Sequence, residues 1–171
     1  MSLTLHTAPG DYCAIKALVT AKYAGVAVST NVLDAPGLGK LPKNKDFLKL
    51  NPTGKVPTLE CGDGSAVWQS NAIARYLARL GPSANLLGGT FQEQTQVDQW
   101  LDFCLNEIEV SSTMLYYPAL GFDQVDGAVA KNAEKFFLTS LKVLDEHLLT
   151  RTFVVGNSIT LADIGKRFFH H

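Results

Sequence analysis

Cysteine is scarce in this sequence, and the few cysteines stand far apart. The 171 residues include three of them, Cys13, Cys61 and Cys104. No two form a Cys-x-x-Cys pair, and none has a histidine at the spacing of a metal site. We therefore expect neither a structural metal site nor a disulfide framework.

The sequence also lacks an excess of charge and a long apolar run. Fifteen Lys and Arg residues face sixteen Asp and Glu residues, which gives a net charge of −1. No apolar run approaches the roughly 18 residues of a membrane helix, and the first ten residues lack the basic and then apolar pattern of a leader. We expect no direct nucleic-acid partner, no membrane partner and a cytoplasmic location.

Apolar residues, in contrast, are plentiful enough for a core. They make up 46% of the chain, whereas charged residues make up 18%, a balance that excludes a disordered chain. At about 150 residues per domain, this length suggests one ordinary domain or two small ones that share an interface.

The first half alternates strand and helix signals. Strands are predicted around Leu3 and Leu5, from Val26 to Val32, and on both sides of the turn Gly62–Ser65. Helices are predicted from Ala14 to Lys22 and through Ile73 to Leu80, with one short helical turn near Phe47 and an irregular loop over 35–45. The order βαβ, short α, ββα predicts a thioredoxin-like domain over residues 1–80.

The second half, residues 91–171, predicts a helical domain after a Gly- and Pro-rich linker. Two apolar helical faces are expected, and their members are Val97, Trp100, Leu101, Cys104, Leu105 and Ile108, then Ala133, Phe136, Phe137, Leu141, Leu144 and Leu148. Tyr116–Pro118 and Gly121 predict a break between them, and Thr160–Asp163 resembles a capping box that starts another helix. The few basic residues after Ile164 suggest that this domain is truncated at its C-terminal end.

The most informative pattern joins Val56-Pro57 to Gln69-Ser70 across the predicted hairpin. If the Val-Pro bond is cis, the backbone N–H and C=O of Val56 can face outward and pair with an extended peptide. Ser70 begins the next helix, where its hydroxyl and the free N–H groups can hold a carboxylate, and the Gln69 amide can donate and accept. This pattern indicates a site for a short peptide with a free carboxylate.

Each of these features alone also has a purely structural explanation. Only about 5–6% of X-Pro bonds are cis in folded proteins, and a serine before an apolar run is usually an N-cap. It is the order of the features along the chain that favours a binding site.

That order resembles the glutathione transferase superfamily, in which a thioredoxin-like domain holds the tripeptide and a helical domain offers a second-substrate pocket. From about Leu3 to Ile164 the sequence is also similar to the N-terminal region of the gamma-subunit family of translation elongation factor 1. The blocks that carry this similarity are Ala14–Leu18, Gly54–Pro57, Ser70–Ala74 and Leu149–Ile164.

The resemblance implies two roles that are compatible with each other. One is an assembly platform for the nucleotide-exchange subunits of elongation factor 1, and the other is an S-transferase that conjugates glutathione or a related thiol to electrophiles. Glutathione would then be a ligand or cosubstrate rather than a bound cofactor, and a homodimer remains an option. A thioredoxin-like reductase is disfavoured because the predicted helix start carries a single cysteine.

The resemblance also implies roles for individual residues. Val56 would give the backbone pairing and Pro57 the cis turn, Gln69 and Ser70 would contact the γ-glutamyl group, and Lys55 would line the same strand entrance. A transferase further needs a donor for the thiolate at the first helix start, where Tyr12, Cys13 and Thr7 are candidates. Asp11 at the same helix end would oppose a second negative charge, so enzymatic activity is left open.

Overall fold

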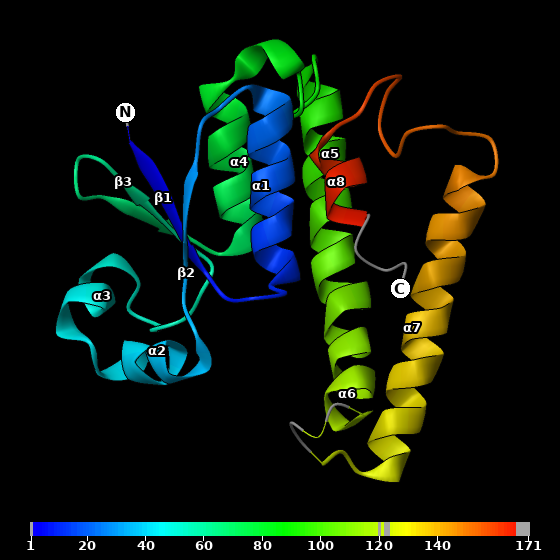
Figure 1. Cartoon of the computed structure of the whole chain (residues 1–171). Helices are drawn as coiled ribbons and strands as arrows, with labels where there is room; N and C mark the ends of the chain where they lie inside the picture. The colour runs from blue at the N-terminus through cyan, green and yellow to red at the C-terminus, as the bar shows by residue number, and fades with distance from the viewer. Residues whose placement is uncertain (1, 120, 122–123, 167–171) are drawn as a thin grey trace. The chain divides into compact units, whose positions relative to one another are not determined.

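The chain folds into two compact units. The computed structural model describes residues 2–119, 121 and 124–166; the first unit ends at Leu87 and the second spans Gly88–Lys166. The first unit is a sheet with helices and the second consists of helices (Figure 1). This arrangement confirms the predicted fold class, a thioredoxin-like region followed by a helical one.

A four-stranded mixed sheet organises the first unit. Its order is β2-β1-β3-β4, in which β2 is parallel to β1, and β3 is antiparallel to both β1 and β4. The strands are β1 (Leu3–Thr7), β2 (Ser29–Val32), β3 (Thr58–Cys61) and β4 (Ala66–Trp68). β3 and β4 confirm the predicted hairpin, whose turn is fixed by Ser65, which donates its N–H and hydroxyl to Asp63 Oδ1 at 2.9 and 2.7 Å.

The second strand is shorter than the sequence predicts. The expectation of a strand from Val26 was wrong, because β2 begins only at Ser29. Gly25 ends the preceding helix in the left-handed conformation, and Val26 and Val28 then pack against the core before the chain joins the sheet edge. The apolar alternation here reflects loop residues that pack on the core, and it does not indicate strand pairing.

Within the described part of the first unit the α-helices are α1 (Tyr12–Ala24), α2 (Ala35–Lys40), α3 (Lys45–Leu50) and α4 (Ser70–Leu80). Two short 3-10 turns, Leu41–Lys43 and Pro82–Ala84, accompany them. Figure 1 shows α1 and α4 side by side along the sheet, with α2 and α3 apart from them.

The prediction of an irregular loop over 35–45 was wrong, because α2 and a 3-10 turn occupy most of it. Asp34 caps α2 by accepting the N–H of Gly37 at 2.7 Å, and Pro36 lies in the first turn, where its missing N–H costs no helical hydrogen bond. The side-chain cap therefore outweighs the low helix propensity of proline and glycine.

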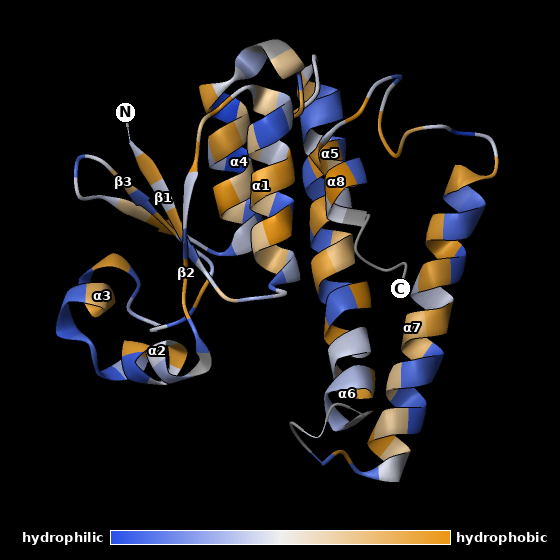
Figure 2. Cartoon of the chain, in the orientation of Figure 1, coloured by the Kyte–Doolittle hydropathy of each residue, from blue (hydrophilic) through white to orange (hydrophobic). Residues whose placement is uncertain are grey.

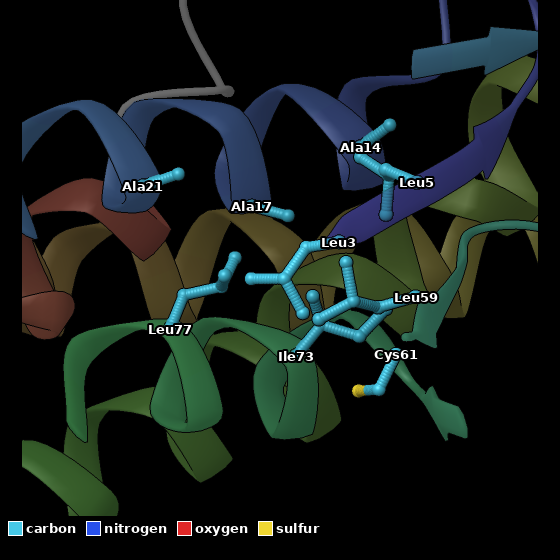
Figure 3. Packing of buried hydrophobic residues seen from close by; sticks show 9 residues of the cluster. All are labelled: Leu3, Leu5, Ala14, Ala17, Ala21, Leu59, Cys61, Ile73 and Leu77. Atoms are coloured by element: carbon cyan, nitrogen blue, oxygen red, sulfur yellow. The ribbon is translucent and has the colours of Figure 1, made fainter. Parts of the chain in front are cut away.

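The core of the first unit lies between the sheet and the pair α1 and α4 (Figure 3). Strand residues meet small residues of α1 and branched residues of α4; the cluster is Leu3, Leu5, Leu59 and Cys61, then Ala14, Ala17 and Ala21, then Ile73 and Leu77. The alanines let α1 approach closely, so α1 and α4 are held firmly on one face of the sheet.

The second unit contains α5 (Phe91–Phe103), α6 (Val110–Ala119), α7 (Gly127–Leu148) and α8 (Leu161–Lys166). A π-helical segment, Cys104–Glu109, joins α5 to α6. The predicted helix start at Thr160 is confirmed, since α8 begins at the next residue. The expectation of a break at Tyr116–Pro118 was wrong, because α6 runs through Pro118 to Ala119; the positive φ of Gly121 comes only after the helix has ended. Figure 2 shows hydrophobic residues recurring among hydrophilic ones along α7.

Two members of the predicted apolar faces are exposed to solvent. Leu105 is 39% exposed and Phe136 is 62% exposed. Leu105 lies in the π-helical segment, whose wider turn changes the angular position of its side chain. On α7 the buried residues are Ala133, Ser140 and Leu144, and Phe136 lies outside the face that they form.

Asp163 fixes the loop that precedes α8. Its carboxylate accepts the Val154 N–H at 2.8 Å and the Thr160 N–H at 2.9 Å. Thr160 also donates its hydroxyl to Asp163 at 3.1 Å, so only the carboxylate half of the predicted reciprocal cap is formed. Both amide donors belong to buried residues, at 3% exposure each, so each needs this partner.

Replacing Asp163 with alanine is expected to destabilise the second unit by about 2 kcal/mol, because two buried N–H groups lose their acceptor. Urea denaturation measures the loss, and hydrogen exchange at the Val154 amide locates it. D163N keeps one acceptor oxygen and should lose less, and D145A, on the exposed side of α7, serves as the control. Unchanged exchange at Val154 in D163A would contradict the assigned contact.

The predicted C-terminal truncation concerns the residues after Ile164. Gly165 and Lys166 complete α8, and residues 167–171 lie outside the described part of the chain. Among the residues that are described, no helix combines the length and the apolar character needed to cross a membrane.

Candidate functional site

Strand register brings the predicted site segments to one end of the sheet. His6 of β1 pairs with Thr58 of β3, and Thr58 pairs with Trp68 of β4. The residues just after β1, just before β3 and just after β4 must therefore lie at the same end. These residues lead into α1, include Val56 and Pro57, and begin α4, so segments about fifty residues apart in sequence converge.

The Val56-Pro57 peptide bond is cis, as the binding-site interpretation requires. Buried Asn51 braces the loop before it, donating to the Lys55 carbonyl at 2.8 Å and to Thr58 Oγ1 at 2.9 Å. The Thr58 hydroxyl donates to the same Lys55 carbonyl at 2.8 Å. Val56 and Pro57 are half-buried on this braced loop, whereas the Lys55 side chain is exposed.

Gly54 is required in this loop by its backbone conformation and by a close neighbour. Its φ is +64°, and a Cβ there would lie 2.9 Å from Pro42 Cα. Any side chain would push the loop away from Pro42, so glycine allows the chain to pack tightly just before Lys55 and Val56.

Gln69 and Ser70 stand at the amino end of α4. Ser70 is the first residue of the helix and is half-buried, and Gln69 precedes it with an exposed side chain. Gln69 has φ +74° and ψ 121°, a backbone conformation that residues other than glycine seldom adopt. Such backbone strain concentrates at functional positions, which agrees with the role expected for this residue.

Gln69→Gly is expected to stabilise the first unit by up to about 1 kcal/mol, because glycine adopts positive φ without strain. The same change removes the amide, so affinity for glutathione should fall. Thermal melting with and without glutathione measures both effects. Q69A is the matched control, since it loses the amide but keeps the strain. Equal melting temperatures for Q69G and Q69A in the absence of ligand would contradict the strain.

The first turn of α1 lies at the same end of the sheet. Asp11 caps α1, and its Oδ1 accepts the N–H of Cys13 at 2.9 Å and of Ala14 at 3.2 Å. Buried Thr7 donates its hydroxyl to Asp11 Oδ2 at 3.2 Å. Tyr12 and Cys13 are half-buried in this turn. A carboxylate of the chain itself therefore occupies the positive end of α1.

The structure thus gathers all the predicted site residues, Tyr12, Cys13, Lys55, Val56, Pro57, Gln69 and Ser70, at one end of the sheet. It also adds Asn51 and Thr58, which the sequence analysis did not assign. Asn51 Oδ1 accepts the Thr53 N–H at 3.0 Å, an Asx turn of the kind that asparagine favours at loop positions. Its several partners, however, become visible only in three dimensions.

Comparisons with known proteins agree with this geometry. Residues 12–80 match the family model of the glutathione S-transferase N-terminal domain. The chain is 42% identical over 96% of its length to elongation factor 1-gamma 3 of Oryza sativa subsp. japonica, and 39% identical over 94% to elongation factor 1-gamma of Artemia salina. It spans only 39% and 36% of those two proteins.

A solved structure extends the match to the whole fold. The delta-class glutathione transferase of Nilaparvata lugens superposes with a TM-score of 0.83 at 30% identity, covering 95% of this chain and 74% of the transferase. The fold, the cis-proline corner and the helix that begins at Ser70 agree with this relationship. The sequence is similar to elongation factor 1-gamma proteins, and the chain belongs to the glutathione transferase superfamily.

Proposed function

We propose that this chain is a glutathione transferase-like domain of an elongation factor 1-gamma protein, acting in the cytoplasm as an assembly platform for the nucleotide-exchange subunits of translation elongation. The similarity to proteins of that name extends over nearly the whole chain. The observation that carries the proposal is the Asp11 cap, because it argues against catalysis at the place where a transferase would activate its thiol.

The chemistry of thiol activation explains why the Asp11 cap argues against catalysis. A thiolate is stabilised by donors and positive potential at a helix N-terminus. In this domain the Cys13 and Ala14 N–H groups already donate to Asp11. A thiolate placed there would lose those donors and face a carboxylate, so the site would favour binding of the thiol form over its activation.

Binding of the tripeptide itself is part of the proposal. The Val56 backbone would pair with the cysteinyl part, Pro57 would hold the turn, and Gln69 and Ser70 would contact the γ-glutamyl group, with Lys55 beside the entrance. The convergence of these residues at one sheet end supports the assignment. In this role glutathione is a ligand that stabilises the fold of the platform.

Co-purification tests the platform role. The folded domain is immobilised and mixed with a purified nucleotide-exchange subunit of elongation factor 1, and the delta-class transferase serves as a matched bait of the same fold. Specific recovery on this domain is the expected result. Equal recovery on both baits, or no recovery on a domain shown to be folded by circular dichroism, would refute the proposal.

An active S-transferase is the second candidate. Tyr12 and Cys13 favour it, since both are half-buried in the first turn of α1, where either could donate to a thiolate. Retention on a glutathione resin together with conjugation of a chromogenic aryl halide would support it. Loss of that activity in Y12F or C13S would identify the donor, and an inactive wild-type domain that binds glutathione would exclude this candidate.

A further inference from the structure

A buried lysine joins the two helices that flank the proposed site. Lys16 of α1 is only 2% exposed. Its Nζ donates to Oδ1 of Asn71 in α4 at 2.9 Å, and Asn71 is itself 7% exposed. Lysine is seldom buried unless its ammonium is partnered, so this contact helps to hold both side chains in place.

Small buried residues of α1 and α4 accompany this side chain. Ala17, next to Lys16, is fully buried, and on α4 Ala74 and Ala78 are 1% and 2% exposed. Small residues let the two helices approach closely, and the lysine stem fills the space between them. Among the described residues no buried side-chain nitrogen or oxygen lacks a hydrogen-bond partner, so the contact belongs to a fully satisfied interior.

This contact is made by the residue next to Ser70, which is proposed to hold the carboxylate. Asn71 follows Ser70 in the first turn of α4, whose N–H groups would receive the γ-glutamyl carboxylate. Lys16 also stands one turn after Cys13 on α1. The ammonium therefore holds the beginning of α4 in place and adds positive charge to the positive end of the same helix.

We propose that Lys16 is a positioning residue for glutathione, which fixes Asn71 and strengthens the attraction of the α4 N-terminus for the α-carboxylate of the γ-glutamyl group. The inference rests on the proposed glutathione site. It predicts that removing the ammonium charge weakens binding only of a ligand that carries the carboxylate, because the effect is electrostatic. A loss of packing would instead weaken binding of every ligand alike.

Two ligands separate these effects. Calorimetric titration compares glutathione with the tripeptide in which 4-aminobutyrate replaces the γ-glutamyl residue, which removes only that carboxylate. K16M removes the charge, and K16Q removes the charge but keeps a donor for Asn71. K22M is the matched control, since Lys22 is an exposed lysine of the same helix.

K16M and K16Q are expected to weaken glutathione binding by about tenfold and to change binding of the decarboxylated tripeptide by less than about twofold. K22M should bind both ligands as the wild type does. If K16M does not fold, K16Q still provides the test. Equal losses for both ligands, or no loss in K16Q, would overturn the role of Lys16 while leaving the site intact. A wild-type domain that binds neither ligand would instead overturn the glutathione site itself, and this inference with it.

Discussion

Replacing Asp11 with serine is expected to raise the rate of glutathione conjugation at least about tenfold, the order of effect of one well-placed donor at a reacting anion. Serine still caps a helix, so α1 should remain folded. Its hydroxyl can donate to the thiolate, and the carboxylate that would repel the thiolate is gone. The fraction of bound glutathione present as thiolate, measured by its ultraviolet absorbance, should rise in parallel with the conjugation rate.

The other Asp11 variants separate charge from capping. D11A removes both and should cost about 1 kcal/mol of stability, whereas D11N keeps a capping oxygen and removes only the charge. In D11A the Thr7 hydroxyl would lose its bond to the Asp11 carboxylate and keep only the 3.4 Å contact to the Ala8 carbonyl. If D11S binds glutathione as the wild type does but conjugates it no faster, Asp11 is not what limits activation, and the observation behind the platform proposal fails.

Ile73→Ala is expected to destabilise the first unit by about 3–4 kcal/mol, because it opens a cavity in a fully packed core. Ile73 is 0% exposed and lies in the cluster between the sheet and α4 (Figure 3). Its N–H also donates to the Gln69 carbonyl at 2.9 Å, which closes the first turn of α4. Glutathione affinity should therefore fall together with stability.

Leu80→Ala is the matched control on the same helix. Leu80 is 41% exposed, so its truncation should cost less than about 1 kcal/mol and leave binding unchanged. Urea denaturation followed by circular dichroism measures both variants. Similar losses for Ile73 and Leu80 would mean that α4 does not present its apolar face to the sheet.

The parts of the fold that the sequence predicted most closely depend on neighbouring residues. The hairpin strands, Thr58–Cys61 and Ala66–Trp68, lie on both sides of the predicted Gly62–Ser65 turn, because that turn fixes their register locally. The helix from Ser70 to Leu80 likewise follows its own apolar stripe and ends before Pro82. Each signal lies within the element that it specifies.

Other features differ from the sequence prediction. The stretch around Pro36 and Gly37 resembles a loop in composition, and it becomes helical because the Asp34 side chain reaches a backbone N–H. Leu105 and Phe136 fit an apolar stripe, yet they are exposed. Whether an apolar residue is buried depends on what the rest of the chain places opposite it, which helical spacing does not encode.

The sequence by itself determined the fold class and the set of residues that form the candidate site, because turn chemistry, apolar spacing and the order of motifs are local properties. Only the tertiary structure decided how those residues act together. It placed the Asp11 carboxylate on the first N–H groups of α1, braced the cis-proline loop with Asn51, and buried Lys16 against Asn71. These contacts depend on hydrogen-bond geometry and on burial, which are set by the packing of the whole unit. The last of them joins residues 55 positions apart in the sequence.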